Sequence, residues 1–217
     1  NKNCIVILSS GEVCEMPWRH QVSAVLLTWF SGEGMGSAIA DILFGKVSPS
    51  GRLANTVPER LQDTPAYLSF DGNVYEIPYA EDIYVGYRYY EKKGIQPAYP
   101  FGYGLSYTEF SLDNVKLSTQ KVTPDGVEVT ADVTNIGQMD GTQTVLVYVK
   151  AEREGTPNPQ LKGIAKAALK KGETKTVHIT LPEEAFGLCD DDGVKRVHKG
   201  SYTIYIGEKA AGTVVKD

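Results

Sequence analysis

The sequence predicts an α/β domain, with a mostly parallel sheet and helices, over residues 1–108, followed by an all-β sandwich of the immunoglobulin type over residues 109–217. Two observations lead to this prediction. In the first part, continuous apolar runs alternate with segments of helical periodicity, which is the pattern of an α/β sheet. From Phe110 onward, apolar residues recur at every second position, which is typical of half-buried strands.

The first part opens with two expected strands and a helix between them. The apolar run Cys4–Leu8 is typical of a parallel strand buried on both faces, and Gly11 interrupts it. A helix is expected to begin at Pro17 or Trp18, because proline is tolerated in the first helical turn. A second apolar strand is expected at Ala24–Phe30.

A second helix is expected at Ser37–Phe44. Its apolar positions Ile39, Ile42 and Leu43 fall on one face at spacings of three and four residues, and Gly45 ends it. Strands and helices that alternate with short connections predict right-handed crossovers between parallel strands.

The second part has room for about seven strands. Its period-two alternation is clearest at Val127–Val133, Val145–Val149, Val177–Leu181 and Tyr202–Ile206. Turn signals separate these runs at Asp125-Gly126, Asp140-Gly141, Lys171-Gly172 and Asp192-Gly193. Short strands with regular turns predict the β-sandwich.

Composition excludes several classes of partner. The chain has 217 residues, enough for one large or two ordinary domains, and its hydrophobic share of 41% suits a globular core. A formal charge of −5 argues against nucleic acid and anionic membranes as partners, since both need a clustered basic face. The longest apolar stretch, Ala24–Phe30, is far shorter than the ~20 residues of a membrane helix.

The three cysteines, Cys4, Cys14 and Cys189, cannot all pair within the chain, and their spacing fits neither a metal knuckle nor a CxxC motif. We expect free thiols, with Cys4 acting as a small buried hydrophobe. Free thiols favour a reducing compartment, so a cytoplasmic location is expected.

The stretch Ala80–Phe110 concentrates tyrosine and glycine. It contains Tyr84, Tyr87, Tyr89, Tyr90, Tyr99, Tyr103 and Tyr107, with Gly86, Gly94, Gly102 and Gly104 between them. Composition alone favours an aromatic-rich segment that covers the edge of a core. The order and spacing resemble the segment that joins the α/β sandwich domain to the fibronectin type III-like domain in glycoside hydrolase family 3.

Other motifs extend the resemblance along the whole chain. They are MPW at Met16–Trp18, the run Ala24–Leu53, DTPAY at Asp63–Tyr67, VTNIG at Val133–Gly137, DGTQTVLVYV at Asp140–Val149, QLKG at Gln160–Gly163 and KKGETKTVHITL at Lys170–Leu181. Two departures occur, because the family usually has Asn at the position of Ser48 and Pro at that of Ala54. The resemblance implies that residues 1–108 are the C-terminal part of an α/β sandwich domain, a partial sandwich that ends in the connecting segment, and that residues 109–217 have a fibronectin type III-like fold.

The resemblance also implies a parent enzyme of the β-glucosidase or β-xylosidase type, acting on β-glucosides or β-xylosides. In that family the nucleophile Asp lies on a (β/α)8 barrel, and the acid/base Glu lies in an EGxDR-type motif shortly before the strand that opens this chain. Neither motif occurs here. Because retaining glycosidases need two carboxyl groups about 5 to 5.5 Å apart, the chain alone is expected to be inactive.

The implied partners are therefore the missing barrel and the first half of the α/β domain. We expect no catalytic, cofactor-binding or metal-ligating residue in this chain. Two alternatives remain open: a circular permutation in which the barrel follows Asp217, and a stand-alone module that binds carbohydrate or protein without catalysis.

Two groups of residues imitate functional sites. Gly32, Gly34 and Gly36 imitate a dinucleotide fingerprint, but the third glycine comes one residue early and no acidic residue follows at the required distance. A tight turn that lets a helix pack against the sheet explains them better. Glu76, Glu81 and Asp82 lie close to aromatic residues, as in sugar chemistry, although fixing a loop with Arg88 as partner is the favoured role.

The remaining polar and aromatic candidates also favour structural roles. Asp190–Asp192 suggests calcium but lacks the alternating ligands of an EF-hand, so a solvated turn is expected. The histidines, His20, His178 and His198, share no ligand spacing. Trp18 and Trp29 lie within apolar segments and are expected in the core.

We predict that the isolated chain self-associates, as a homo-oligomer or an aggregate. If residues that normally cover Cys4–Leu8 are missing, apolar faces and an open sheet edge remain. By contrast, Phe110–Asp217 should fold well alone. Size exclusion with light scattering and a thermal melt check this, and a monodisperse monomer whose two parts melt cooperatively would contradict it.

Overall fold

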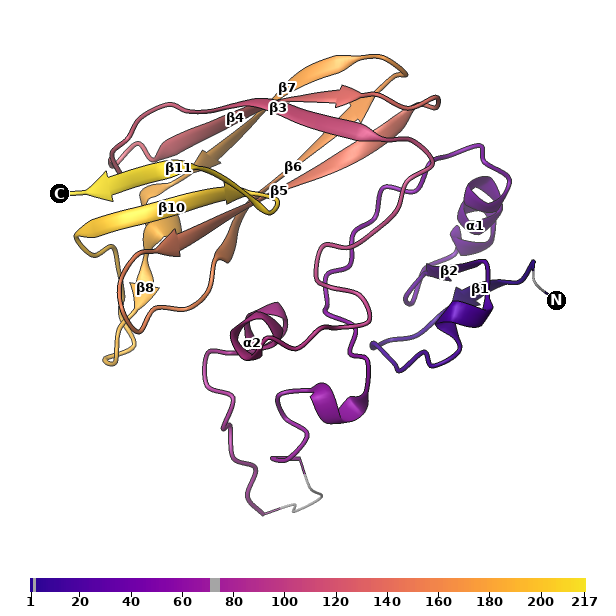
Figure 1. The fold of residues 1–217 in the computed structure, drawn as a ribbon, viewed down its shortest axis with the longest axis horizontal. Coiled ribbons are helices and arrows are strands. Elements are labelled where there is room, and N and C mark those ends of the chain that lie inside the picture. The colour runs from indigo at the N-terminus through magenta and orange to yellow at the C-terminus, as the bar shows by residue number, and fades with distance from the viewer. Residues whose placement is uncertain (2, 71–74) are drawn as a thin grey trace. The chain divides into compact units, whose positions relative to one another are not determined.

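The computed structural model describes residues 1, 3–70 and 75–217 and contains two compact units (Figure 1). The first, called here the α/β unit, comprises Asn1–Lys46 and Arg52–Gly104. The second, the sandwich unit, comprises Val47–Gly51 and Leu105–Asp217. Among the described residues, no helix has the length and apolar character needed to cross a bilayer.

The α/β unit contains a parallel strand pair. Strand β1 (Ile5–Leu8) runs parallel to β2 (Ala24–Leu27), with Ile5 opposite Ala24 and Leu8 opposite Leu27. The predicted parallel pairing is thus present, while a larger sheet stays a prediction. Strand β2 ends before Phe30 because Trp29 adopts a left-handed backbone with φ of 54°, which a strand cannot continue.

The prediction that the first strand is buried on both faces is wrong for this chain. Ile5 and Ile7 are 50% and 43% exposed, whereas the alternate residues Val6 and Leu8 are half-buried. Cys4 is likewise half-buried rather than buried. One face of the strand is therefore open to solvent, as expected if covering residues lie outside this chain.

The helices differ from the predicted ones. Helix α1 spans Met35–Leu43, two residues earlier at its start than predicted, and Gly45 ends it with φ of 71° and its amide bonded to the Ile42 carbonyl. The predicted helix at Pro17 or Trp18 is wrong, because only a 3-10 turn, η1 (Arg19–Gln21), forms there. Val22 is already extended two residues before β2, which leaves no room for an α-helix.

Two further elements complete the α/β unit. A second 3-10 turn, η2, spans Leu61–Asp63, and helix α2 spans Tyr87–Lys93. In the described part of this unit, the buried hydrophobic side chains are Met16, Val57 and Tyr90. Three buried hydrophobic residues are a very small core for a unit of this length.

The sandwich unit has the predicted seven long strands in its fully described residues. One antiparallel sheet has the order β3-β4-β7, and the other has the order β11-β10-β5-β6 (Figure 1). Their bounds are β3 Phe110–Leu117, β4 Val127–Asn135, β5 Gly141–Ala151, β6 Gln160–Leu169, β7 Thr174–Leu181, β10 Gly200–Ile206 and β11 Lys209–Lys216. A 3-10 turn, η3 (Glu183–Phe186), and a short hairpin, β8 (Leu188–Cys189) and β9 (Lys195–Arg196), connect β7 to β10.

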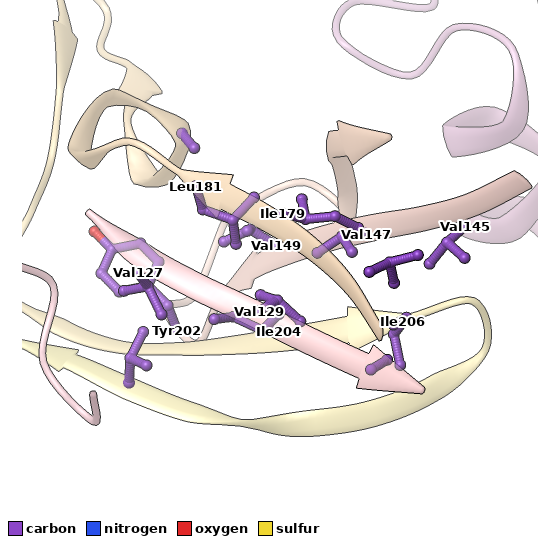
Figure 2. Packing of buried hydrophobic residues seen from close by; sticks show 14 of the residues in the cluster. Val127, Val129, Val145, Val147, Val149, Ile179, Leu181, Tyr202, Ile204 and Ile206 are labelled. Atoms are coloured by element: carbon purple, nitrogen blue, oxygen red, sulfur yellow. The ribbon is translucent and has the colours of Figure 1, made fainter. Parts of the chain in front are cut away.

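Period-two alternation builds the core between the two sheets. Along β4, every odd residue from Val127 to Asn135 is buried and every even one is half-buried. Twenty buried hydrophobic residues form one cluster, which Figure 2 shows with β4, β5, β7 and β10 contributing inward side chains. At about 1.5–3 kcal/mol for each fully buried aliphatic side chain, this cluster is the main stabilising feature of the unit.

A buried asparagine, Asn135, is the last inward-facing residue of β4. Asn135 is fully buried, and its Oδ1 accepts bonds from Thr108 Oγ1 at 2.6 Å and from the Gly137 amide at 3.2 Å. Its Nδ2 donates to the Met139 carbonyl at 2.8 Å and to the Leu169 carbonyl at 3.4 Å. Because every polar atom of the carboxamide has a partner, its burial carries no unpaired-group penalty.

Thr108 also lies so close to two positions of the chain that only glycine fits there. A Cβ at Gly137 would lie 2.2 Å from Thr108 Oγ1, and a Cβ at Gly141 would lie 2.6 Å from Thr108 Cγ2. Both distances are impossible for real side chains, so the VTNIG and DGTQ motifs each need a glycine for close approach. Gly141 is already the first residue of β5, so the turn predicted at Asp140-Gly141 lies just before this strand.

A distant segment, Val47–Gly51, belongs to the sandwich unit and is called the strap here. Buried Ser48 accepts the Tyr107 amide at 3.0 Å, the Ser106 hydroxyl donates to the Pro49 carbonyl at 2.8 Å, and Thr144 donates to the Ser50 carbonyl at 3.3 Å. A piece cut at Phe110 would lack both the strap and Thr108. That it folds well alone stays a prediction.

The β8–β9 hairpin is held by an ion-pair network. Arg196 binds Asp192 with two bonds of 2.8 and 2.7 Å and binds Asp190 at 2.8 Å, while His198 lies 2.7 Å from Asp190. The Arg196 guanidinium holds the pKa of both carboxyl groups below the usual value, chiefly through its hydrogen bonds. The expected solvated turn is present, with the carboxylates of Asp190 and Asp192 paired.

We predict that Thr108→Val destabilises the sandwich unit by about 1–2 kcal/mol, because it removes one donor from a buried carboxamide oxygen. Exchange rates of the slowest amides in β4 and β5 measure the free energy of unfolding of this unit. Thr134→Val is the matched control, since the Thr134 hydroxyl bonds to Thr174 on the exposed surface. Equal effects of the two substitutions would contradict the role of Thr108.

We predict that acid weakens the hairpin and that Arg196→Gln removes part of this pH dependence. A carboxyl group whose folded-state pKa is lowered stabilises the fold above its unfolded pKa of about 3.9, and this contribution is lost as pH falls through the folded-state pKa. NMR titration of Asp190 and Asp192 should show both midpoints rising in Arg196→Gln. Lys195→Gln should leave them in place, and identical midpoints in wild type and Arg196→Gln would refute the prediction.

Candidate functional site

The three acidic candidates, Glu76, Glu81 and Asp82, lie on irregular backbone before helix α2. Glu76 and Asp82 are exposed, and Asp82 adopts a left-handed backbone with φ of 52°. Glu81 is half-buried, and its Oε2 atom is shielded from solvent with no hydrogen-bond partner in the described structure. The pairing of these acids with Arg88 stays a prediction.

This arrangement does not supply the geometry of a glycosidase. Double displacement needs two carboxyl groups held rigidly on either side of a sugar, one to attack and one to donate a proton. Two of the three acids are exposed on irregular backbone, which does not hold a carboxylate in a fixed direction. What the group can do is attract a cation or accept hydrogen bonds from a partner.

The tyrosine- and glycine-rich stretch packs largely against itself. Helix α2 begins after Gly86 with φ of 55° and ends at Gly94 with φ of 64°, two left-handed positions. Tyr90 is buried, and this burial raises the pKa of its hydroxyl. Ring pairs reinforce the packing, with centroid distances of 5.0 Å for Tyr87–Phe101, 5.1 Å for Tyr99–Tyr103 and 5.8 Å for Tyr89–Tyr90.

Backbone bonds tie this stretch to residues 53–57. The Tyr103 carbonyl accepts the Leu53 amide at 2.8 Å, and Tyr99 and Val57 exchange amide–carbonyl bonds of 2.9 and 3.3 Å. Val57 is also buried. These contacts favour the structural role of the stretch, in which aromatic rings cover the small core of the α/β unit.

The three glycines near α1 form the expected turn but not the expected close packing. The Gly32 carbonyl accepts the Met35 amide at 3.1 Å, which closes a tight turn. A Cβ at Gly32, Gly34 or Gly36 would meet nothing within 4 Å, so close helix–sheet contact does not require them. Beside them lies a hollow of about 440 Å³ with a mainly apolar lining from β2 and α1.

The other candidates are the histidines, the Asp190–Asp192 turn and the two tryptophans. Among the described residues, no group of three His, Cys, Asp or Glu side chains is placed to hold a metal ion. His178 pairs with Glu128 on the surface, and the Asp190 turn is bound by Arg196. The prediction that Trp18 and Trp29 lie in the core is wrong, because both are only half-buried.

Sequence reasoning missed the polar contacts that define the sandwich unit. Asn135 falls on the inward register of Val127–Val133, so the alternation could have predicted a buried asparagine that needs hydrogen-bond partners. Ser48 gave no such signal, because its partner Tyr107 is 59 residues away. A contact at that separation leaves no mark in local periodicity.

Comparison with known families agrees with this architecture. The family model of the glycosyl hydrolase family 3 C-terminal domain matches residues 1–107, and that of the fibronectin type III-like domain matches residues 143–210. Thermostable beta-glucosidase B of Acetivibrio thermocellus is 40% identical over 99% of this chain, which covers 29% of that protein. The exo-alpha-(1->6)-L-arabinopyranosidase of Bifidobacterium longum is 40% identical over 95% of this chain, which covers 28% of that protein.

A solved structure extends the agreement to the fold. The family 3 β-glucosidase of Bifidobacterium adolescentis superposes with a TM-score of 0.89 and 37% identity, over 99% of this chain and 33% of that one. The chain thus spans about a third or less of the relatives it matches. It belongs to glycoside hydrolase family 3, of which it carries the C-terminal domain and the fibronectin type III-like domain.

Proposed function

We propose that this chain is the non-catalytic C-terminal part of a retaining β-glycosidase, and that it supports and walls an active site whose nucleophile Asp and acid/base Glu lie outside it. The coverage of the relatives carries this proposal. The first of them matches 99% of the chain, while the chain covers only 29% of that protein. The partners are then the (β/α)8 barrel and the first half of the α/β domain.

The two units differ in how much apolar surface they bury, and this difference favours a structural role for the chain within a larger protein. The sandwich unit encloses a cluster of twenty buried hydrophobic residues. The α/β unit leaves β1 half-exposed and an apolar hollow open beside β2 and α1. A unit that buries so little is stable when further layers cover it, so we propose a larger, mostly parallel sheet completed by other residues of the parent.

The substrate class is a β-linked glycoside, of the glucoside or xyloside type. Relatives named as beta-glucosidases support the glucoside, although one relative of equal identity is named as an exo-alpha-(1->6)-L-arabinopyranosidase, which differs in both sugar and linkage. The three unpaired cysteines support a cytoplasmic location for the parent. A homo-oligomer is compatible with the open faces of the α/β unit.

A second function, carbohydrate binding by the chain alone, is favoured by one observation. Tyr75 and Tyr79 are 92% and 82% exposed. Exposed aromatic rings are the usual platform for stacking on sugars, since their faces are apolar and rigid. This alternative requires no catalytic carboxylates and is separated from the first by the same assay.

We predict that the chain shows no turnover of aryl β-glucosides or β-xylosides, and that activity appears when a barrel fragment is added. The fragment is the part of the Acetivibrio thermocellus relative that this chain does not match, produced separately. The fragment alone is the control. Turnover by the chain alone would overturn the proposal, and silence of the mixture together with sugar binding by the chain would favour the binding module.

A further inference from the structure

The segment Tyr75–Val85 combines two unusual surface properties. Its first property is exposed apolar area, because five large hydrophobic side chains in eleven residues are open to solvent: Tyr75, Ile77, Tyr79, Ile83 and Val85. Apolar residues scattered singly on a surface need no explanation, whereas apolar residues that lie together mark an interaction surface, and these five lie within eleven residues along the chain. We therefore expect another part of a protein to cover this segment.

Its second property is a single sign of charge. Glu76, Glu81 and Asp82 lie in the segment, and it contains neither lysine nor arginine. A partner that covers these residues must accept three carboxylates at or near the contact. Complementary potentials favour a basic partner surface, whereas an acidic one would be repelled.

Glu81 adds a specific demand. One of its carboxylate oxygens is shielded from solvent and has no hydrogen-bond partner in the described structure. A shielded acceptor without a hydrogen-bond donor lowers the stability of the chain, and a hydrogen bond from an N–H group would remove this cost. Where it lies, this atom is out of reach of a partner. A turn of the Glu81 side chain would bring it to an arginine, a lysine or a backbone amide of the partner.

We propose that Tyr75–Val85 is a docking surface for the barrel-bearing part of the parent polypeptide, which meets it with an apolar centre and a basic rim. This inference rests on the proposed function and names the surface through which it operates. The length of the relatives supports the occupant, since about two thirds or more of their chains lie outside the matched region.

Other occupants fit the segment less well. A second copy would bring three carboxylates against three carboxylates, and nucleic acid or an anionic membrane would add further negative charge. A sugar would stack on Tyr75 and Tyr79, but the aliphatic Ile77, Ile83 and Val85 offer it no aromatic face.

The test compares substitutions in the segment with matched substitutions elsewhere. Glu76→Lys combined with Asp82→Lys reverses two charges of the segment, and Glu81→Gln keeps the shape of Glu81 while removing its charge. Asp113→Lys combined with Asp125→Lys makes the same charge change at exposed positions of the sandwich unit. Titration calorimetry with the separately produced barrel fragment of the Acetivibrio thermocellus relative measures Kd at low and high salt.

The expected result is a loss of affinity of tenfold or more for the double lysine variant, with a weaker salt dependence than wild type. Glu81→Gln should also weaken binding, while the sandwich control stays within twofold of wild type. Segment variants that bind as well as the control would overturn the docking surface but leave the proposed function intact. Failure of the wild-type chain to bind the fragment would overturn both.

A separate titration of the chain alone with cellobiose decides the carbohydrate outcome. Tyr79→Ser removes an exposed ring and leaves the buried residues of the α/β unit unchanged. Under the proposal, neither wild type nor Tyr79→Ser binds the sugar, and Tyr79→Ser binds the fragment more weakly. Sugar binding that disappears in Tyr79→Ser would identify a carbohydrate surface and overturn the proposal.

Discussion

The need to cover every apolar face explains most of the difference between the two units. In the sandwich unit, two sheets present alternating residues to one another, and their side chains fill the space between the layers (Figure 2). In the α/β unit, β1 and β2 form a pair of four-residue strands, and the hollow beside α1 stays open. Two short parallel strands cannot close a core, because parallel sheets depend on layers on both faces.

Polar contacts tie segments outside the seven strands to the sandwich unit. Asn135 binds Thr108, which precedes the first strand of the unit, and Ser48 binds Tyr107 from a segment more than fifty residues earlier. A buried polar atom without a partner costs free energy, and the partners of Asn135 and Ser48 lie in the residues before β3. The fibronectin type III-like part is therefore not a simple appendage after residue 108.

The sequence predicts those elements whose residues form a local pattern. Val127–Val133 and Tyr202–Ile206 have a clear period of two, and both lie in long strands with the predicted residues inward. The helix expected at Trp18 fails because proline tolerance indicates where a helix can begin, not that one has space to form before β2. Trp29 and Ile5 fail for another reason, since their burial depends on neighbours that a local pattern does not describe.

The two open surfaces of the α/β unit make different demands on whatever covers them. The hollow beside β2 and α1 is mainly apolar, so it selects a partner by shape and hydrophobicity alone. The Tyr75–Val85 segment adds three carboxylates, and so selects a partner by charge as well. Apolar contact gives affinity without direction, and charge gives orientation with little affinity. A partner that satisfies both is held in one orientation. The proposed role as a wall of an active site requires this, because a catalytic geometry tolerates displacements of only about 0.5 Å.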